Sequence, residues 1–332
     1  MSRKFDRLVI AVVIGAVCVT AAASLVSPTH KVTASPRVSF DVDKAESADR
    51  NRPRAALQLA SLEAAIDAKG ENNAVGLAKR FEKIGYDLDR VRDDGHYVPR
   101  IFLARLPNDL HSVPEVELKK TVFFKTMLPL VLQENERILA DRKRLIRLRV
   151  EKNLGNKLEA RDRLWLAVLA ERYKVKDESI SELLRRVDVV PPSLAMAQAA
   201  EESGWGTSRF AQVGNALFGQ WTTAGGDGLI PEDRPEGMDH KVRKFGTLTQ
   251  SVAAYMRNLN THRAYREFRR ERQNDRKKGN ALGGYDLAAT LSSYSARGTE
   301  YISSIRSIID ANALRALDEA KLSRTALRDP AA

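Results

Sequence analysis

The sequence predicts a mostly helical α+β protein that carries one small β-lobe or hairpin. Of the 332 residues, 43% are hydrophobic, 30% charged and 6% aromatic, which is typical of a folded, helix-rich body and not of a disordered chain. Amphipathic helical patterns recur along most of that body. The tract 220–244 departs from them, because it combines the run AGGDG with prolines and few helix formers, so we expect the β-structure there.

Residues 1–27 are predicted to be a membrane anchor or a signal segment. Leu8–Val26 is an uncharged run of nineteen residues. At 1.5 Å per residue it reaches about 28 Å, enough to cross a bilayer core. Basic residues precede it, so we expect the N-terminus in the cytoplasm and the remaining chain exported. The length favours an uncleaved transmembrane helix, while Ala21-Ala22-Ala23 leaves a cleavable signal peptide open. Residues 28–54 follow as a polar linker with prolines.

Residues 55–114 are predicted to form a helical N-terminal extension of the main domain. The hydrophobic patterns predict helices at Ala55–Asp67 and Asn73–Arg92, and a short extended piece at Val98–Leu106. The main domain is placed at residues 115–320, and residues 321–332 are expected to form a flexible tail. These boundaries leave one α-rich domain without a long internal linker.

The main domain is expected to begin with a long helix from Glu115 whose second half is highly charged. We interpret that charge as a solvated face with i,i+4 ion pairs. The basic stretch Arg263–Lys278 is interpreted as a helix end followed by an exposed loop. Further helices are predicted at Arg161–Tyr173, Ser179–Val187, Thr247–Phe268 and Tyr285–Leu317, the last interrupted at Ser295–Gly298.

Charge and cysteine content limit the classes of partner. The net charge of +12 indicates affinity for polyanions, which include nucleic acid, anionic lipid and anionic cell-wall polymer. Cys18 is the one cysteine, so no internal disulfide and no cysteine metal site can form. The histidines are scattered without a metal-binding spacing. We therefore expect no metal and no cofactor. Nucleic acid is not an expected partner either, because an exported body would not meet it.

The stretch around Glu201 and Glu202 is the candidate for chemistry. Pro191 and Pro192 favour a helix start, and the glycines of the run SGWG favour its end. In helical register Gln198 and Glu202 share a face, while Glu201 lies about 100° away. A carboxylate at an apolar helix end can have a raised pKa and act as a general acid. The alternative from the residues alone is ordinary surface charge at a helix end.

The run AQAAEESGWGTSRFA followed by GNALFGQW resembles the signature of bacterial β-N-acetylglucosaminidases of glycoside hydrolase family 73, which hydrolyse peptidoglycan. The similarity extends over roughly residues 98–317. It implies a lysozyme-like fold with a helical body, a β-lobe and a cleft between them. Glu202 stands at the position of the family's catalytic acid, so the resemblance assigns the general acid to it.

The resemblance also implies a second carboxylate from the β-lobe, for which Glu232, Asp233 and Glu236 are the candidates. Glu232 is preferred because the apolar pair Leu229-Ile230 would hold that end of the lobe in place. A solvated acidic loop is the alternative for each. The substrate's own 2-acetamido group can also replace a second carboxylate.

Tyr294 and Tyr301 resemble the family's paired tyrosines, one of which lines the cleft. This chain reads YSARGTEY in place of the commoner Tyr-x-Thr-Asp-Pro-x-Tyr, and core packing is the alternative role. Tyr301 is assigned to catalysis and Tyr294 to substrate binding. Gln198, Asn215 and Trp221 are the other substrate-binding candidates; Asn215 could instead satisfy a turn, and Trp205 is expected to pack in the core.

Together these features imply an exported endo-β-N-acetylglucosaminidase on the periplasmic side of the inner membrane. It would cleave the β-1,4 bond after N-acetylglucosamine, with peptidoglycan glycan strands as its partner and the N-terminal helix in the membrane. A lytic transglycosylase or muramidase on the same fold is one alternative. A non-catalytic wall-binding scaffold that uses the basic stretch Arg263–Lys278 is the other.

Overall fold

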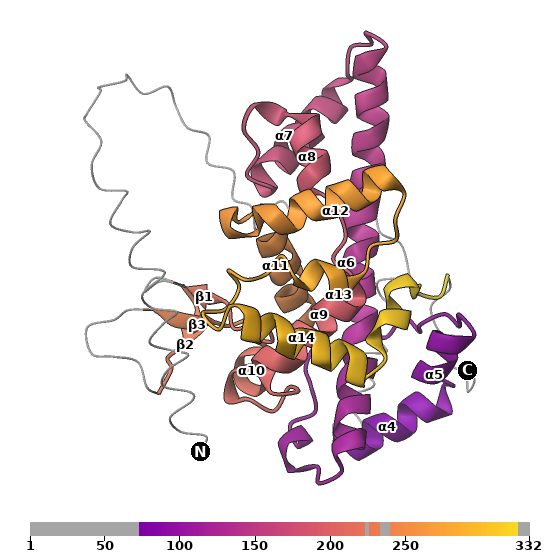
Figure 1. Ribbon diagram of the computed structural model, residues 1–332, viewed down its shortest axis with the longest axis vertical. Coiled ribbons are helices and arrows are strands. Elements are labelled where there is room, and N and C mark those ends of the chain that lie inside the picture. Colours follow the sequence, from indigo (N-terminus) through magenta and orange to yellow (C-terminus); the bar gives the residue numbers. More distant parts are fainter. Residues whose placement is uncertain (1–72, 223–225, 233–239, 325–332) are drawn as a thin grey trace. The chain divides into compact units, whose positions relative to one another are not determined.

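The computed structural model describes residues 73–222, 226–232 and 240–324 (Figure 1). The predicted membrane segment Leu8–Val26, the linker and the helix Ala55–Asp67 lie outside the described residues, as do Asp233 and Glu236. Within the described ranges, no helix is both long enough and apolar enough to cross a membrane. All described residues belong to the unit that runs from Ala65 to Ala332.

The helix α6 (Val116–Asn153) has a buried first half and a charged second half. The apolar residues between Val122 and Leu132 are all buried. In the second half, Arg144 lies 2.7 Å and Arg147 3.2 Å from Asp162, which belongs to α7 (Ala160–Arg172). The predicted i,i+4 pairing is therefore wrong at these arginines, because their carboxylate comes from a neighbouring helix that the sequence pattern cannot place.

The helix α9 (Pro192–Ser203) packs against α6, α13 (Gly284–Ala288), α14 (Thr299–Ala311) and the 3₁₀ helix η5 (Leu314–Glu319), as Figure 1 shows. Every residue from Pro192 to Ala200 is buried. A Cβ at Gly284 would lie 2.1 Å from Ser193 Oγ, so only glycine lets α13 approach this closely. Asp318 accepts hydrogen bonds from the Ser193 amide and hydroxyl at 2.8 Å, which fixes the start of α9.

The N-terminal extension is joined to the end of the described chain. The predicted single helix Asn73–Arg92 is broken into α4 (Ala74–Lys83) and α5 (Leu88–Asp93), because Gly85 takes a φ of +70°. Val98 donates its amide proton to the Lys321 carbonyl at 2.8 Å and accepts one from Ser323 at 2.9 Å. Residues 321–323, at the start of the predicted tail, thus form a short parallel pairing with Val98.

The basic stretch after α11 (Leu248–Thr261) is helical. The predicted helix Thr247–Phe268 ends at Thr261, and a second helix, α12 (Arg266–Lys278), follows the 3₁₀ turn η4 (Arg263–Tyr265). The prediction of an exposed loop is wrong, because Arg272 is fully buried. Its guanidinium donates to the backbone carbonyls of Arg185, Arg186, Asp188 and Val189.

The predicted β-lobe is a small antiparallel sheet in the order β1-β3-β2. Its strands are β1 (Trp221–Thr222), β2 (Gly228–Leu229) and β3 (Lys241–Arg243). A Cβ at Gly228 would lie 2.8 Å from the Val242 carbonyl oxygen, so this close strand contact requires glycine. The remaining described elements are η2 (Leu110–Ser112), η3 (Lys176–Glu178), α8 (Ile180–Arg186) and α10 (Arg209–Gly214). The prediction of a mostly α protein with a small β-element is confirmed.

Candidate active site

The turn after α9 holds Glu202 at the last turn of a buried helix. Gly204 caps the helix in the left-handed conformation with φ +57°, and Gly206 follows with φ +77°. A Cβ at Gly206 would lie 2.5 Å from Leu106 Cδ1 and 3.1 Å from Phe123. Trp205 is half-buried and packs edge-on against Phe124 with 5.2 Å between ring centroids, which favours its expected packing role. The glycines therefore let the chain turn sharply against the core directly after the acid.

The carboxyl group of Glu202 is held in a site that favours its protonated form. Its pKa is raised to about 7, mainly by burial and also by the adjacent negative charge of Glu201. A hydrogen-bonding interaction with the Tyr301 hydroxyl and the charge of Arg297 act in the opposite direction. Glu202 as a residue is half-buried, and its carboxyl group is largely removed from solvent. A carboxylic acid with a pKa near 7 can donate a proton at neutral pH.

A chain of hydrogen bonds extends from Glu202 into the core. The Tyr255 hydroxyl donates to Gln198 Oε1 at 2.7 Å, and Gln198 Nε2 donates to the Tyr301 hydroxyl oxygen at 2.7 Å. The Tyr301 hydroxyl proton is then directed at the Glu202 carboxylate. Burial raises the pKa of both tyrosines well above the ordinary value, so both hydroxyls keep their protons. The chain therefore orients one donor toward the acid.

Aromatic rings surround this chain. Tyr294 stacks on Tyr301 with 5.4 Å between centroids and 6° between planes, and Tyr265 lies 5.7 Å from Tyr294. Phe218 stacks on Tyr255 at 3.9 Å. The next residue, Gly219, approaches the acid, since a Cβ there would lie 3.4 Å from Glu202 Oε2. The matched block NALFG thus supplies one wall beside the acid.

Glu201 has a different environment from that of its neighbour. Its Oε1 accepts from Arg297 Nη1 at 2.6 Å, and its Oε2 accepts from Ser304 Oγ at 2.9 Å. Both oxygens are therefore engaged in fixed contacts with the segment around α14. This arrangement separates a structural glutamate, Glu201, from an acid whose carboxyl group has a raised pKa, Glu202.

Two predicted substrate-binding residues are buried. Gln198 is 0% exposed and contacts the hydroxyls of Tyr255 and Tyr301, so it positions those tyrosines. Asn215 is 1% exposed and takes a left-handed φ of +50°. Its Nδ2 donates to the carbonyls of Phe245 at 3.0 Å and Gly246 at 3.2 Å. This geometry favours the turn-satisfying role of Asn215 over direct contact with substrate.

The candidates in the β-lobe are on the surface. Trp221 is 39% exposed on β1 and contacts the His240 ring at 4.6 Å, so its face is available to a ligand. The Glu232 side chain is 83% exposed and lies 3.3 Å from Arg209 Nε. Arg209 also donates to the Ile230 carbonyl at 2.8 Å, which ties this end of the lobe to α10. The role of Glu232 as a second carboxylate stays a prediction.

Sequence reasoning missed Tyr255 and Arg297. Tyr255 falls in the apolar stripe of α11 with Val252, Met256 and Leu259, and the pattern assigns it to the core. A tyrosine hydroxyl in a buried stripe needs a polar partner, and that requirement is the signal that could have singled it out. Arg297 lies in an irregular segment 96 residues from Glu201, and no sequence spacing predicts that contact.

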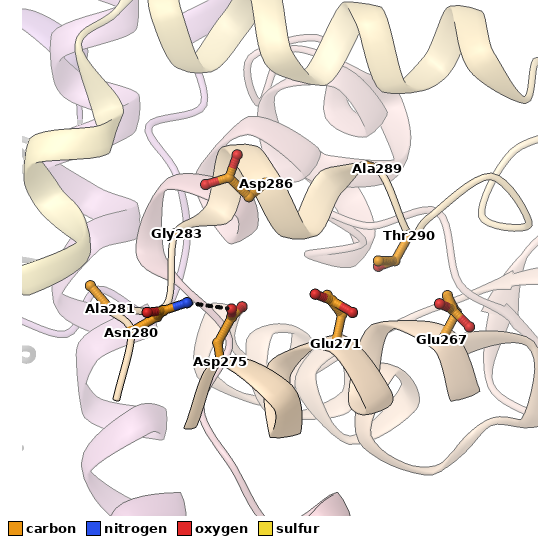
Figure 2. Close-up of a pocket in the computed structure, with 9 residues that line it drawn as sticks. All are labelled: Glu267, Glu271, Asp275, Asn280, Ala281, Gly283, Asp286, Ala289 and Thr290. Atoms are coloured by element: carbon orange, nitrogen blue, oxygen red, sulfur yellow. Dashed lines mark hydrogen bonds between the residues drawn. The ribbon is translucent and has the colours of Figure 1, made fainter. Parts of the chain in front are cut away.

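A separate cavity of about 660 Å³ lies between α12 and the segment 280–290 (Figure 2). Glu267, Glu271 and Asp275 project into it from one face of α12, opposite Asp286. Asn280 donates to Asp275 at 3.3 Å. Over the described ranges, no group of histidines, cysteines and carboxylates has the arrangement of a metal site. Neither Glu202 nor its tyrosines line this cavity.

Comparison with known proteins identifies the family that this chain resembles. The model of the Glucosaminidase family, described as mannosyl-glycoprotein endo-beta-N-acetylglucosaminidase, matches residues 177–314. That range includes α9, the sheet and α14. The chain is also 34% identical over 199 residues to Protein bax of Escherichia coli (strain K12), across 58% of this chain and 69% of that protein. No solved structure matches, so the lysozyme-like arrangement stays a prediction.

The acid at the end of α9 and the matched family define the class: a protein with a glucosaminidase domain, which indicates a hydrolase-type function on glycans such as peptidoglycan. The identity to Protein bax extends beyond that domain. The chain belongs to the Bax-type proteins with a glucosaminidase domain.

Proposed function

We propose that this protein is an exported peptidoglycan hydrolase that cleaves the β-1,4 bond after N-acetylglucosamine. The observation that carries the proposal is the environment of Glu202, a carboxyl group with a pKa of about 7 at the end of a buried helix. Glycosidic cleavage requires a carboxylic acid to protonate the leaving oxygen. The glucosaminidase match supports the substrate class, and export rests on the sequence of the N-terminal segment.

Glu202 acts as the general acid. In its protonated form one carboxyl oxygen accepts from the Tyr301 hydroxyl, which leaves the proton on the other oxygen, available to the substrate. After proton transfer, the carboxylate is stabilised by the same tyrosine and by the positive charge of Arg297. Tyr301 thus assists the reaction as a donor to the acid, and Gln198 orients Tyr301.

The attack on the anomeric carbon is assigned to the substrate's 2-acetamido oxygen or to water. Glu201 is engaged with Arg297 and Ser304, so it is not available as a nucleophile. Glu232 is the candidate for activating water, and its side chain is 83% exposed and paired with Arg209. Trp221 offers an apolar ring face for a sugar at the edge of the lobe.

The test is digestion of purified peptidoglycan followed by mass spectrometry of the released fragments. We expect reducing N-acetylglucosamine ends from the wild type. A Glu202→Gln variant should release none while keeping its helical circular dichroism spectrum. Anhydro-muramic acid ends would instead identify a lytic transglycosylase, and reducing muramic acid ends a muramidase.

A matched control comes from the neighbouring glutamate. Glu201→Gln removes the same charge one residue away and disturbs only the contacts with Arg297 and Ser304. It should keep a measurable rate, whereas retention of full activity in Glu202→Gln would refute the assignment of the acid. If the wild type binds peptidoglycan but does not cleave it, the result would favour the alternative of a non-catalytic wall-binding scaffold.

A further inference from the structure

A second cavity, of about 420 Å³, lies between α8, the end of α11, η4 and the first turn of α12. We call it the arginine pocket. Its lining consists of five arginines, one glutamate and one threonine: Arg185, Arg186, Arg263, Arg266, Arg269, Glu182 and Thr261. The lining charge is therefore strongly positive, and the single carboxylate neutralises only part of it. Clustered guanidinium groups are suited to oxyanions, which they can bind through two parallel hydrogen bonds.

One side of the pocket is fixed by internal contacts. Glu182 accepts from Arg185 and from Arg186, the latter at 2.7 Å. Arg269 is 3% exposed and its Nη1 donates to the carbonyls of Leu259 at 2.7 Å and His262 at 2.9 Å. These bonds hold three guanidinium groups in place. The pKa of Arg269 is lowered to about 10, mainly by burial and also by the neighbouring arginine charges.

The other side of the pocket is open. Arg263 and Arg266 are exposed, and within the part of the chain that the structure describes neither side chain has an ion-pair or hydrogen-bond partner. His262, beside them, has its pKa lowered by burial and by the charges of Arg263, Lys174 and Arg269. The charge at the mouth of the pocket is therefore positive, and Glu182 compensates only part of it.

One short element, η4, contributes Arg263 to the pocket and Tyr265 to the tyrosine cluster of the candidate active site. Tyr265 lies between Arg263 and Arg266 in the chain, and its ring lies 5.7 Å from Tyr294. Burial and, to a smaller extent, the charge of Glu202 raise the pKa of Tyr265 to about 12, so Tyr265 lies within the electrostatic environment of Glu202. On α12 the acidic residues Glu267 and Glu271 project into the other cavity, so the helix separates its charges by face (Figure 2).

We propose that the arginine pocket binds carboxylate groups of the peptides attached to the glycan strand, and so selects peptide-bearing strands for cleavage at Glu202. The proposal rests on the proposed function. A glycan strand that is cleaved at Glu202 carries its charged groups on the attached peptides, because its sugars are largely neutral. The pocket next to Tyr265 supplies the complementary charge at that place.

The experiment compares two forms of one substrate. Intact peptidoglycan carries its peptides, whereas the same strands treated with an amidase have lost them. In an Arg263→Ala/Arg266→Ala variant, the ratio of kcat/KM on intact strands to kcat/KM on peptide-free strands should fall about tenfold, mainly through KM on the intact form, since charge-assisted hydrogen bonds to the peptides are lost.

The matched control is Lys277→Ala/Lys278→Ala, which removes the same charge from exposed positions at the far end of α12. It should keep the wild-type ratio. The proposal is overturned if the arginine variant keeps that ratio, if it loses activity equally on both substrates, or if the lysine control lowers the ratio equally.

A direct binding measurement separates this proposal from the proposed function. If the wild type cleaves neither substrate, the proposed function fails, and calorimetry then decides the pocket. The probes are the amidase-released peptides and inorganic tripolyphosphate. Binding of the peptides that is lost in Arg263→Ala/Arg266→Ala supports the pocket as a carboxylate site. Binding of tripolyphosphate alone, or of neither probe, overturns it.

Discussion

Arg297 and Glu201 form an ion pair with 2.6 Å between Nη1 and Oε1, one residue from the proposed acid. The pair draws the negative charge of Glu201 toward α14 and places a positive charge near Glu202. Two adjacent glutamates at one helix end therefore have separate roles. The pair also provides a means of changing the pKa of Glu202 without touching its carboxyl group.

The wild-type enzyme should lose activity as the pH rises through about 7, because the acid then gives up its proton. Glu201→Gln should move this loss to lower pH. The negative charge of Glu201 raises the pKa of Glu202, and its removal also takes the Glu201 carboxylate away from Arg297, whose charge lowers the pKa of Glu202. The measurement is kcat/KM against pH on peptidoglycan. A loss that moves to higher pH would contradict this account of the pair.

Tyr301→Phe should move the loss of activity in the opposite direction. The hydroxyl of Tyr301 stabilises the ionised form of Glu202, so its removal raises the pKa of the acid. We also expect kcat to fall by about tenfold to a hundredfold, because the donor that orients the carboxyl group is lost. Tyr255→Phe is the comparison. It keeps the Tyr301 hydroxyl and should have the smaller effect on both quantities.

Glu202→Gln should stabilise the fold at alkaline pH. The pKa of Glu202 is about 7 in the folded protein, above the ordinary value of 4.5 that represents the unfolded chain. The folded state therefore binds this proton more tightly, and stability is lost as the pH rises from 4.5 to 7. The amide removes that loss, which amounts to at most about 3 kcal/mol.

Thermal unfolding at pH 4 and at pH 8 tests this prediction. The Tm of Glu202→Gln should exceed that of the wild type at pH 8 and approach it at pH 4. Glu232→Gln serves as the control, because its side chain is 83% exposed, and it should show no such difference. A Glu202→Gln variant that is less stable than the wild type at pH 8 would rule out a destabilising buried charge.

Substitutions at Asn215 and Trp221 should have different effects, the first on the stability of the fold and the second on substrate binding. Asn215→Gly keeps the left-handed backbone but removes the hydrogen bonds to Phe245 and Gly246, and should cost about 1–3 kcal/mol of stability. Trp221→Ala changes an exposed ring and should leave the Tm nearly unchanged while raising KM. Unfolding curves and peptidoglycan kinetics on both variants distinguish these outcomes. A rise in KM without loss of stability for Asn215→Gly would restore its predicted substrate contact.

The end of α9 could be predicted from the sequence because its signals are local. Two prolines start the helix, glycines stop it, and the register puts Glu202 on the face of Gln198. Each of these features concerns residues fewer than five positions apart, where backbone preferences act directly. The three-stranded sheet was also foreseeable as a small β-element, since glycine and proline interrupt the helical pattern there.

The environment of α12 could not be predicted, because its stabilising contacts are distant in the sequence. Arg272 donates to carbonyls more than 80 residues away, and its burial anchors one face of a basic helix to the core. In the same way, the Glu201–Arg297 contact joins segments 96 residues apart. Spacing and periodicity in the sequence carry no information on such pairs. Only the folded structure shows that Arg297 lies near Glu201 and Glu202.

The pairing of Val98 with residues 321–323 joins the N-terminal extension to the C-terminal end of the described chain. The segment that follows Val98 leads to Ala104, whose carbonyl accepts from Leu248, and to Leu106, which packs against Gly206 behind the acid. Trimming the last few folded residues would thus act at a distance. It would remove the hydrogen bonds that hold Val98 and so loosen the segment that packs behind the turn after Glu202. A truncation at the C-terminal end would therefore change the position of the proposed acid.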